Sequence, residues 1–294
     1  LAVPGMDQAT FEQAAAARFQ TVLKNDFEVR IRRIAEEIRR YKPDLIGLQE
    51  AARWLRGPDG VKDGGTTPAN QVVYDSTEVL LKHLRSLGQR YRVVASRAWF
   101  DFEAPTALGF DVRLIQHDVI LARQGSKVRT GRTFRGGFRD TFDPPTTIGV
   151  ARQRRGWVGT DARVGNRRFR FVTTHLEAYS PEIGDKQARQ LLNGPLKSKR
   201  LQSILVGDLN SGPRARSDRG TQRTANPYET VIGAGFVNPL PRRNTCCFGE
   251  DLSSTSERLT SWIDHIVLRP GPRRVVRSAV FGNRTSDRIG GMWP

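Results

Sequence analysis

The sequence has little cysteine and no long apolar run, and each shortage excludes a class of protein. The only two cysteines, Cys246 and Cys247, are adjacent, so neither a cysteine-ligated metal cluster nor an ordinary disulfide framework can form. A disulfide between these neighbours, a bridge to another molecule and two free buried thiols all fit. No apolar run approaches the ~18 residues that a membrane-spanning helix needs, so we expect a soluble chain without a transmembrane segment.

No charged-then-apolar leader is present either, but a secreted protein in its mature form would look the same. The compartment therefore stays open, with secretion as one possibility. The oligomeric state also stays open.

Negative charge is scarce relative to positive charge. The chain has 48 Lys and Arg against 30 Asp and Glu, a formal net charge of +18. Such a field attracts nucleic acid, anionic lipid surfaces and phosphorylated small molecules. A coding bias toward arginine explains the charge equally well, because arginine far outnumbers lysine and is scattered along the chain. The charge supports an anionic partner without selecting one.

Helix and strand signals alternate along the whole chain. Apolar residues recur at helical spacing over residues 8–24. Further helices are predicted after capping or proline start signals, which lie at Asn25, Asp75, Ser180 and Asn226. Short apolar runs between them predict strands, with a hairpin over residues 157–174 and a last strand at Val275–Val280. The Gly- and Pro-rich stretch 57–69 and the aromatic and acidic stretch 99–105 are expected to be loops. Because no repeat or linker separates two halves, we expect one domain over residues 1–294, with two β-sheets packed face to face and helices outside each.

The strand-like run Ile204–Val206 is followed by the most informative residues. Gly207 allows a close approach of the backbone, and strand alternation lets Asp208 and Asn210 point the same way while Leu209 points into the core. A carboxylate beside an amide suits the positioning of a water near a phosphate or a metal. A turn-forming Asp/Asn pair after a strand is the alternative.

Three other apolar strands also deliver polar groups. One strand is expected to end at Glu50, another to run into His175 and Glu177, and a further one contains Asp264. Four apolar strands that each carry a polar group are typical of a site built at the edges of sheets.

The ordered motifs LQE, THL, GDLN and IDHI resemble the endonuclease/exonuclease/phosphatase superfamily, from about Phe27 to Pro294. These magnesium-dependent phosphodiesterases include pancreatic-type deoxyribonuclease, apurinic endonucleases, sphingomyelinases and inositol phosphatases. The resemblance implies an α/β (α+β) deoxyribonuclease-like sandwich. It also implies a phosphoesterase that uses Mg²⁺, or Mn²⁺, to hydrolyse a phosphodiester or phosphomonoester. Nucleic acid, lipid and sugar-phosphate substrates all remain open.

The resemblance implies a role for each motif residue. Glu50 would ligate the metal, and Asp208 would orient or deprotonate the attacking water. Asn210 would hold the phosphate, and His175 would donate to a non-bridging or leaving oxygen. Asp264 would pair with a histidine further along the chain.

Some neighbouring residues are weaker candidates. Adjacent strand residues face opposite sides, so His265 is expected to be structural and to point away from Asp264. Glu177 points the same way as His175 by alternation. Arg154 and Arg155 could contact a phosphate, but a solvated pair is the favoured interpretation.

Two elements of the family pattern do not occur in the sequence. A first strand that carries an Asn is not found before the helices, and a final Ser-Asp-His motif is not found after Asp264. Residues 286–288, Ser-Asp-Arg, echo that motif only in part. We therefore expect a chain truncated at both ends relative to its relatives, with weak or no hydrolytic activity.

Two other functions fit the sequence. One is a catalytically impaired relative that binds phosphate-rich partners through its basic surface. The other is a basic nucleic-acid-binding protein whose motifs are coincidental. The second is disfavoured because aromatic residues are not interleaved with arginine along the sequence.

Overall fold

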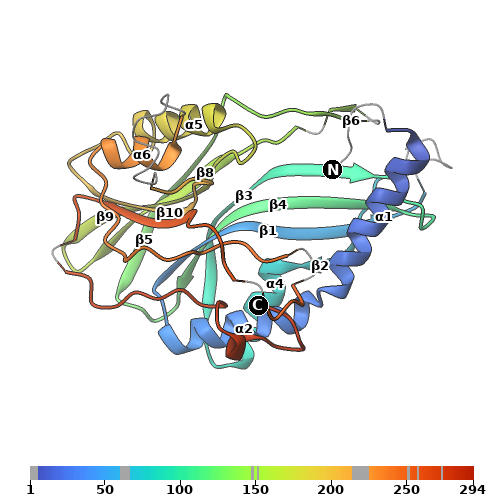
Figure 1. Cartoon of the computed structure of the whole chain (residues 1–294). Coiled ribbons are helices and arrows are strands. Elements are labelled where there is room, and N and C mark those ends of the chain that lie inside the picture. The colour runs from blue at the N-terminus through green and yellow to red at the C-terminus, as the bar shows by residue number, and fades with distance from the viewer. Residues whose placement is uncertain are drawn as a thin grey trace.

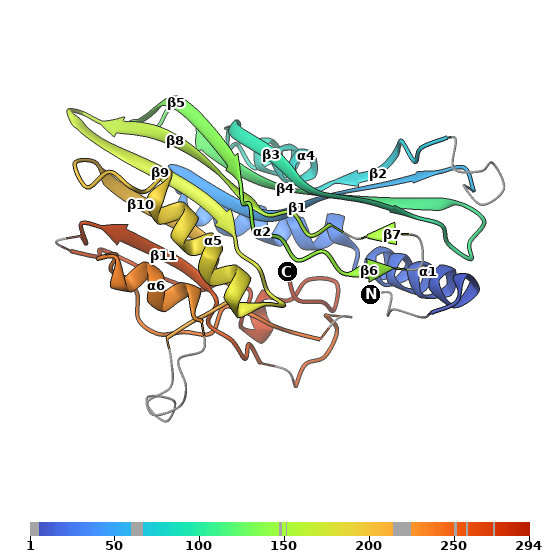
Figure 2. The same ribbon diagram turned by 90° about the horizontal axis from the view of Figure 1, so that it is seen from above.

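Two β-sheets pack face to face, and helices cover the outer side of each (Figures 1 and 2). This is the sandwich predicted from the sequence. None of the described helices is long and apolar enough to cross a membrane. The computed structural model describes residues 6–59, 67–146, 149–150, 152–213, 225–249, 252–256, 258–272 and 274–294.

The first sheet has four antiparallel strands in the order β2-β1-β4-β3. These strands are β1 (Leu45–Gly57), β2 (Gln71–Asp75), β3 (Tyr91–Ala104) and β4 (Asp111–Arg123). Helices α2 (Phe27–Tyr41) and α4 (Ser76–Ser86) cover its outer face. They bury Ala35 and Leu84 fully, in one cluster with Leu121 of β4. Aliphatic residues spaced at helical intervals therefore shield the outer face of the first sheet from solvent.

The second sheet has the order β11-β10-β9-β8-β5. Its strands are β5 (Val128–Gly137), β8 (Gly156–Val164), β9 (Arg167–His175), β10 (Gln202–Asp208) and β11 (Asp264–Arg269). Only β9 and β10 run parallel, and α5 (Pro181–Asn193) makes the crossover between them. Together with α6 (Pro227–Gly233), α5 covers the outer face through Leu191 and Val231. Because β9 and β10 are parallel, their carboxyl ends meet at one edge of the sheet.

The inner faces of the two sheets meet tightly. Ile120, Val158, Phe171 and Val206 form the cluster between them. A Cβ atom on Gly47 of β1 would lie 2.5 Å from Val206 Cγ2, so only glycine permits this approach. The contact fixes the two edges that carry polar groups relative to one another.

The remaining elements lie at the periphery. Helix α1 (Gln8–Lys24) packs Phe19 against Trp54 of β1. The other elements are a short ribbon of β6 (Pro145–Thr146) and β7 (Gly149–Val150), and the 3-10 helix η2 (Thr285–Asp287). A disulfide joins Cys246 and Cys247.

The predicted helices and the β8–β9 hairpin are confirmed, but two strand predictions and one loop prediction are wrong. β1 continues past Glu50 to Gly57, and β3 includes Trp99–Ala104, which the aromatic and acidic composition had suggested was a loop. Residues 275–280 form no strand, although their β-branched residues suit one, because neither sheet pairs with them. Part of the expected loop at residues 57–69 lies outside the described residues.

Candidate active site

Glu50 sits at a bulge in the middle of β1. Leu48 pairs with Val119 and Ala51 with His117, so Gln49 and Glu50 together face the single residue Asp118. Glu50 takes a left-handed backbone conformation with φ of 50°. An extra residue in one strand redirects a side chain. The prediction of a strand end was therefore wrong, and the bulge leaves the Glu50 side chain 52% exposed.

His175 is the last residue of β9 and is buried. Its Nδ1 lies 2.6 Å from Arg155 Nη1, and its Nε2 lies 3.0 Å from Asn210 Nδ2. Arg155 Nη1 and Asn210 Nδ2 are both donors, and a neutral imidazole accepts through only one of its nitrogens, so the ring accepts one of these two bonds at a time. Burial and then the charge of Arg155 hold the pKa of His175 well below its usual value. The imidazole is therefore neutral near pH 7.

The Arg155 guanidinium contacts both His175 and Glu50. Its Nη1 lies 3.8 Å from Glu50 Oε1, and the residue is buried. The expectation of a solvated arginine pair was therefore wrong for Arg155, although Arg154 is exposed. The packing of β8 against the other sheet removes Arg155 from solvent.

Asp118 is a second residue that the motifs missed. It is 2% exposed, and its Oδ2 has no hydrogen-bond partner among the described residues. Burial raises the pKa of Asp118 well above its usual value, and nearby Arg155 opposes the rise. The available signal was a carboxylate directly before the apolar run Val119–Ala122, because charged residues are seldom fully buried without a role.

Asp208 ends β10 between two polar strand ends. It pairs in register with His175 of β9 on one side and with Asp264 of β11 on the other. Asp208 Oδ2 lies 3.6 Å from His175 Nε2. Three polar side chains from three adjacent strands therefore form one row.

Gly207 makes this row possible. Its φ is 147°, and a Cβ there would lie 2.0 Å from the Thr174 carbonyl oxygen. The close approach predicted from the sequence is therefore one to the neighbouring strand.

Asn210 follows in a left-handed turn with φ of 47°. Its backbone N–H donates to Asp208 Oδ1 at 2.7 Å, and its Nδ2 donates to the Leu176 carbonyl at 2.8 Å. Leu209 between them is buried, as strand alternation predicted. Asp208 and Asn210 therefore form the turn that the sequence offered as one alternative, and Asn210 also faces His175.

The carboxyl groups of the row hold their protons more strongly than usual. Burial and then the charge of Asp264 raise the pKa of Asp208 to about 7. Burial likewise raises the pKa of Asp264, opposed by its hydrogen bonding to Thr245. The row thus concentrates acidic groups within a strongly basic chain.

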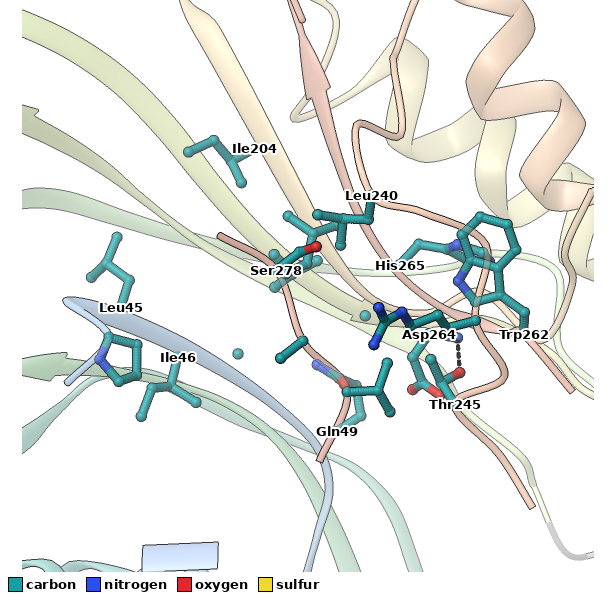
Figure 3. Close-up of a pocket in the computed structure, with 18 of the residues that line it drawn as sticks. Leu45, Ile46, Gln49, Ile204, Leu240, Thr245, Trp262, Asp264, His265 and Ser278 are labelled. Carbon is teal, nitrogen blue, oxygen red and sulfur yellow. Dashed lines mark hydrogen bonds between the residues drawn. The ribbon is translucent and has the colours of Figure 1, made fainter. Parts of the chain in front are cut away.

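His265 lies apart from this row. Its ring packs against Tyr228 and Trp262, and its two nitrogens contact the Ser211 carbonyl at 2.8 Å and Asn238 Nδ2 at 3.1 Å. Figure 3 shows it beside Trp262, on the wall of a groove of about 550 Å³. Burial lowers the pKa of His265 to about 4. Its position agrees with the expectation of a structural residue.

Asp264 lines the same groove, and its backbone N–H donates to Thr245 Oγ1 at 3.0 Å (Figure 3). No histidine of the described chain forms an ion pair with its carboxylate.

Glu177 supports the loop after β9. It is 2% exposed, and its Oε1 accepts from the backbone N–H groups of Ala178 and Tyr179 at 3.0 and 2.8 Å. These bonds hold the turn that follows His175, so Glu177 acts on the shape of the chain there.

The donor set fits a metal ion that is only partly held by protein. In the part of the chain that the structure describes, no three His, Cys, Asp or Glu residues are grouped to hold a metal. Mg²⁺ commonly uses one or two carboxylates, with water and substrate phosphate oxygens completing its shell. Half-exposed Glu50, 3.8 Å from His175, offers such a carboxylate. The residues therefore fit Mg²⁺ bound together with a phosphate.

Comparison with known proteins identifies the family. The model of the endonuclease/exonuclease/phosphatase family matches residues 22–287. A mannosyl-6-phosphatase of Bacteroides thetaiotaomicron has a similar structure at 14% identity, with a TM-score of 0.52 over 88% of this chain and 81% of that one. A family protein from Leptotrichia buccalis has a TM-score of 0.50 at 16% identity, over 82% of this chain and 81% of that one.

No curated protein matches the sequence significantly. The two structural likenesses support the fold alone, and the family model covers most of the sequence. The chain belongs to the endonuclease/exonuclease/phosphatase family.

Proposed function

We propose that the chain is a metal-dependent phosphoesterase that hydrolyses a phosphodiester or phosphomonoester by attack of an activated water. The proposal rests on the row formed by His175, Asp208 and Asp264. Glu50 and Arg155 lie beside that row. It combines a carboxylate poised near neutral pH, cationic and amide donors, and a carboxylate open to a metal.

Asp208 is the proposed base. Burial and Asp264 raise its pKa to about 7, and general bases work best when their pKa lies near the working pH. Its Oδ1 is engaged by the Asn210 N–H, so Oδ2 is the oxygen that would accept a proton from water.

Arg155, His175 and Asn210 are the proposed phosphate ligands. Arg155 Nη1 and Asn210 Nδ2 lie 2.6 and 3.0 Å from the two ring nitrogens of His175, so the three side chains meet from different segments. Preorganised donors of this kind stabilise the charge that develops on phosphate oxygens in the transition state. Arg155 is held in place before substrate arrives, so its reorganisation costs little.

Glu50 is the proposed ligand for Mg²⁺ or Mn²⁺. The ion would neutralise phosphate charge and polarise the ester when bound. Asp264 is proposed to act through Asp208, because its charge raises the pKa of that carboxyl.

The test is hydrolysis of bis-p-nitrophenyl phosphate and of p-nitrophenyl phosphate by the purified chain. It should be run with Mg²⁺, with Mn²⁺ and with excess EDTA. We expect turnover that is weak but metal-dependent, in keeping with the two family elements not found in the sequence, and that falls by at least ~10² in Asp208→Asn because the amide cannot accept the proton. Equal rates for the wild type and Asp208→Asn, or full activity in EDTA, would show that this site does not carry out the hydrolysis.

A further inference from the structure

A second surface of the molecule, next to the candidate active site, is strongly basic. A groove of about 1010 Å³ is lined by residues 97–102 of β3 and by the chain on either side of the β6–β7 ribbon. We call it the arginine groove. Its lining includes the arginines Arg97, Arg139, Arg152, Arg154 and Arg155.

The groove opens directly onto the site. Trp99, Arg154 and Arg155 line it and also line the small cavity that contains Glu50 and His175. A polymer whose reacting phosphate sits at His175 could therefore continue into the groove.

Most of these arginines are free for a ligand. In the part of the chain that the structure describes, no carboxylate forms an ion pair with Arg97, Arg139, Arg152 or Arg154, and all four are exposed. The lining also contains two acidic residues. Asp101 pairs with Arg113 at 2.6 Å, and Asp143 accepts from Thr141 at 3.0 Å. The hydrogen bond from Thr141 leaves the charge of Asp143 in place, so one carboxylate opposes these four arginines and the groove keeps a net positive charge.

Aromatic rings flank the charges. The Arg97 guanidinium lies 5.8 Å from the centroid of the Trp99 ring, and that ring is packed against Gly156, where a Cβ would lie 2.5 Å from Cζ2. Tyr179 is 60% exposed and stacks on Phe142, whose chain neighbours line the groove. The groove thus combines its arginines with one arginine–tryptophan contact and with an exposed tyrosine at its border.

From this arrangement we infer that the arginine groove binds the backbone of single-stranded nucleic acid on one side of the reacting phosphate. The inference rests on the proposed function and names its substrate class. A positively charged groove that follows the backbone, with aromatic faces for bases to stack on, is how single strands are held without sequence preference.

Smaller and apolar ligands fit the groove less well. Arg155, His175 and Asn210 suffice to bind a single phosphate group. Such a ligand would make no contact with the exposed arginines of the groove. Among the described lining residues only Val150 is a strongly exposed large apolar side chain. The groove therefore offers few side chains that could insert into a membrane surface.

The test uses the double variant Arg97→Gln/Arg152→Gln, which leaves the candidate active site intact. The matched control is Arg167→Gln/Arg168→Gln, which removes the same charge from exposed residues at the start of β9, whereas His175 ends that strand. Binding of a fluorescein-labelled oligothymidylate of about ten nucleotides would be followed by anisotropy in EDTA over a range of salt.

We expect the groove variant to bind at least ~10-fold more weakly than wild type. Its plot of log K against log salt should be shallower by about 1.4, because each phosphate contact to a single strand contributes about 0.7. The control should keep the wild-type slope. Tyr179→Ala should lose about tenfold in affinity through lost stacking.

Equal losses in the groove variant and the control would overturn the inference, because bulk charge would then explain binding. Unchanged binding in the groove variant, or stronger binding to phosphatidylserine vesicles than to the oligonucleotide, would also overturn it. Hydrolysis of bis-p-nitrophenyl phosphate reports the proposed function separately. A wild type that is inactive but still binds the oligonucleotide through the groove would contradict the proposed catalysis and leave the proposed binding standing.

Discussion

Asp208 and Asp264 stand directly opposite each other at the paired ends of β10 and β11. Like charges placed across two strands are destabilising. Burial adds to this repulsion, so the folded protein holds a proton on Asp208 up to a pH of about 7. The stability of the fold is therefore coupled to the chemistry of the site.

The first prediction concerns Asp208→Asn and stability. Below its usual pKa of 3.8 the carboxyl is protonated in both the folded and the unfolded chain. Between that value and about 7 only the unfolded chain has lost the proton, so the free energy of unfolding of the wild type falls as pH rises. The variant lacks this loss, which amounts to about 4 kcal/mol for a rise of this size, and should be more stable than the wild type at pH 8. Urea unfolding at pH 4, 6 and 8 measures the difference.

Asp143→Asn is the control, because Asp143 is exposed. It should shift unfolding little at every pH. A stability difference for Asp208→Asn that does not grow between pH 4 and pH 8 would contradict the raised pKa.

The second prediction concerns Glu50→Gln and metal dependence. Glutamine preserves the shape of the bulge but removes the charge that Mg²⁺ prefers. The Mg²⁺ concentration for half-maximal activity should rise by about tenfold or more, with the thermal midpoint nearly unchanged. Glu12→Gln in α1 provides a control distant from the site. An unaltered metal titration would exclude Glu50 as a ligand.

The third prediction concerns Asp118→Asn. Because burial favours the protonated form of Asp118, a neutral amide of the same shape should be tolerated. Turnover should stay within about threefold of wild type, whereas Asp118→Leu, which has no polar atom, should disturb Arg155 and lower turnover further. Steady-state kinetics of the two variants decide the matter. A large loss in Asp118→Asn would mean that the residue acts as a charged anchor for Arg155.

The fourth prediction concerns Arg155→Met. Its guanidinium is within 2.6 Å of His175 Nδ1 and is one cause of the lowered pKa of that ring. Without the charge the pKa of His175 should rise, and turnover should fall by about 10² through loss of a preorganised donor. Proton NMR titration follows the ring, and Arg154→Met serves as the comparison. A pKa of His175 that stays in place would show that burial alone sets it.

Local sequence rules located much of the site because it depends on strand ends. His175, Asp208 and Asn210 follow apolar runs whose alternation fixes which residues face the core, and the capping signals of α2, α4, α5 and α6 depend only on neighbouring residues. These elements were therefore predicted close to where they occur. The one-residue bulge at Glu50 was not, because it arises from pairing with β4, far away in the sequence.

The burial of Arg155 and Asp118 was not predicted for a different reason. Arg155 and Asp118 are buried only when the two sheets come together, and nothing near them in the sequence signals that contact. The outer half of β3 alternates charged residues such as Asp101 and Glu103 with aromatics, because one face is solvated. Composition alone therefore resembled a loop, whereas long-range pairing with β4 makes it a strand.

The last prediction concerns Asp264→Asn and the dependence of rate on pH. If Asp208 is the base, activity should fall on the acidic side as this carboxyl becomes protonated, with a midpoint near its pKa of about 7. Removing the negative charge of Asp264 makes the anion of Asp208 easier to form, so its pKa drops and the acidic limb moves to lower pH. The variant should consequently be more active than wild type, relative to its own maximum, at pH 5.5. The profile of kcat/KM with bis-p-nitrophenyl phosphate between pH 5 and 9 measures this. Thr245→Val provides a milder perturbation of the same sign, because losing the hydrogen bonding that holds the pKa of Asp264 down leaves that carboxyl more protonated without deleting it. The limb should then move in the same direction by a smaller amount. An acidic limb at the same pH in all three proteins would mean that a group other than Asp208 accepts the proton.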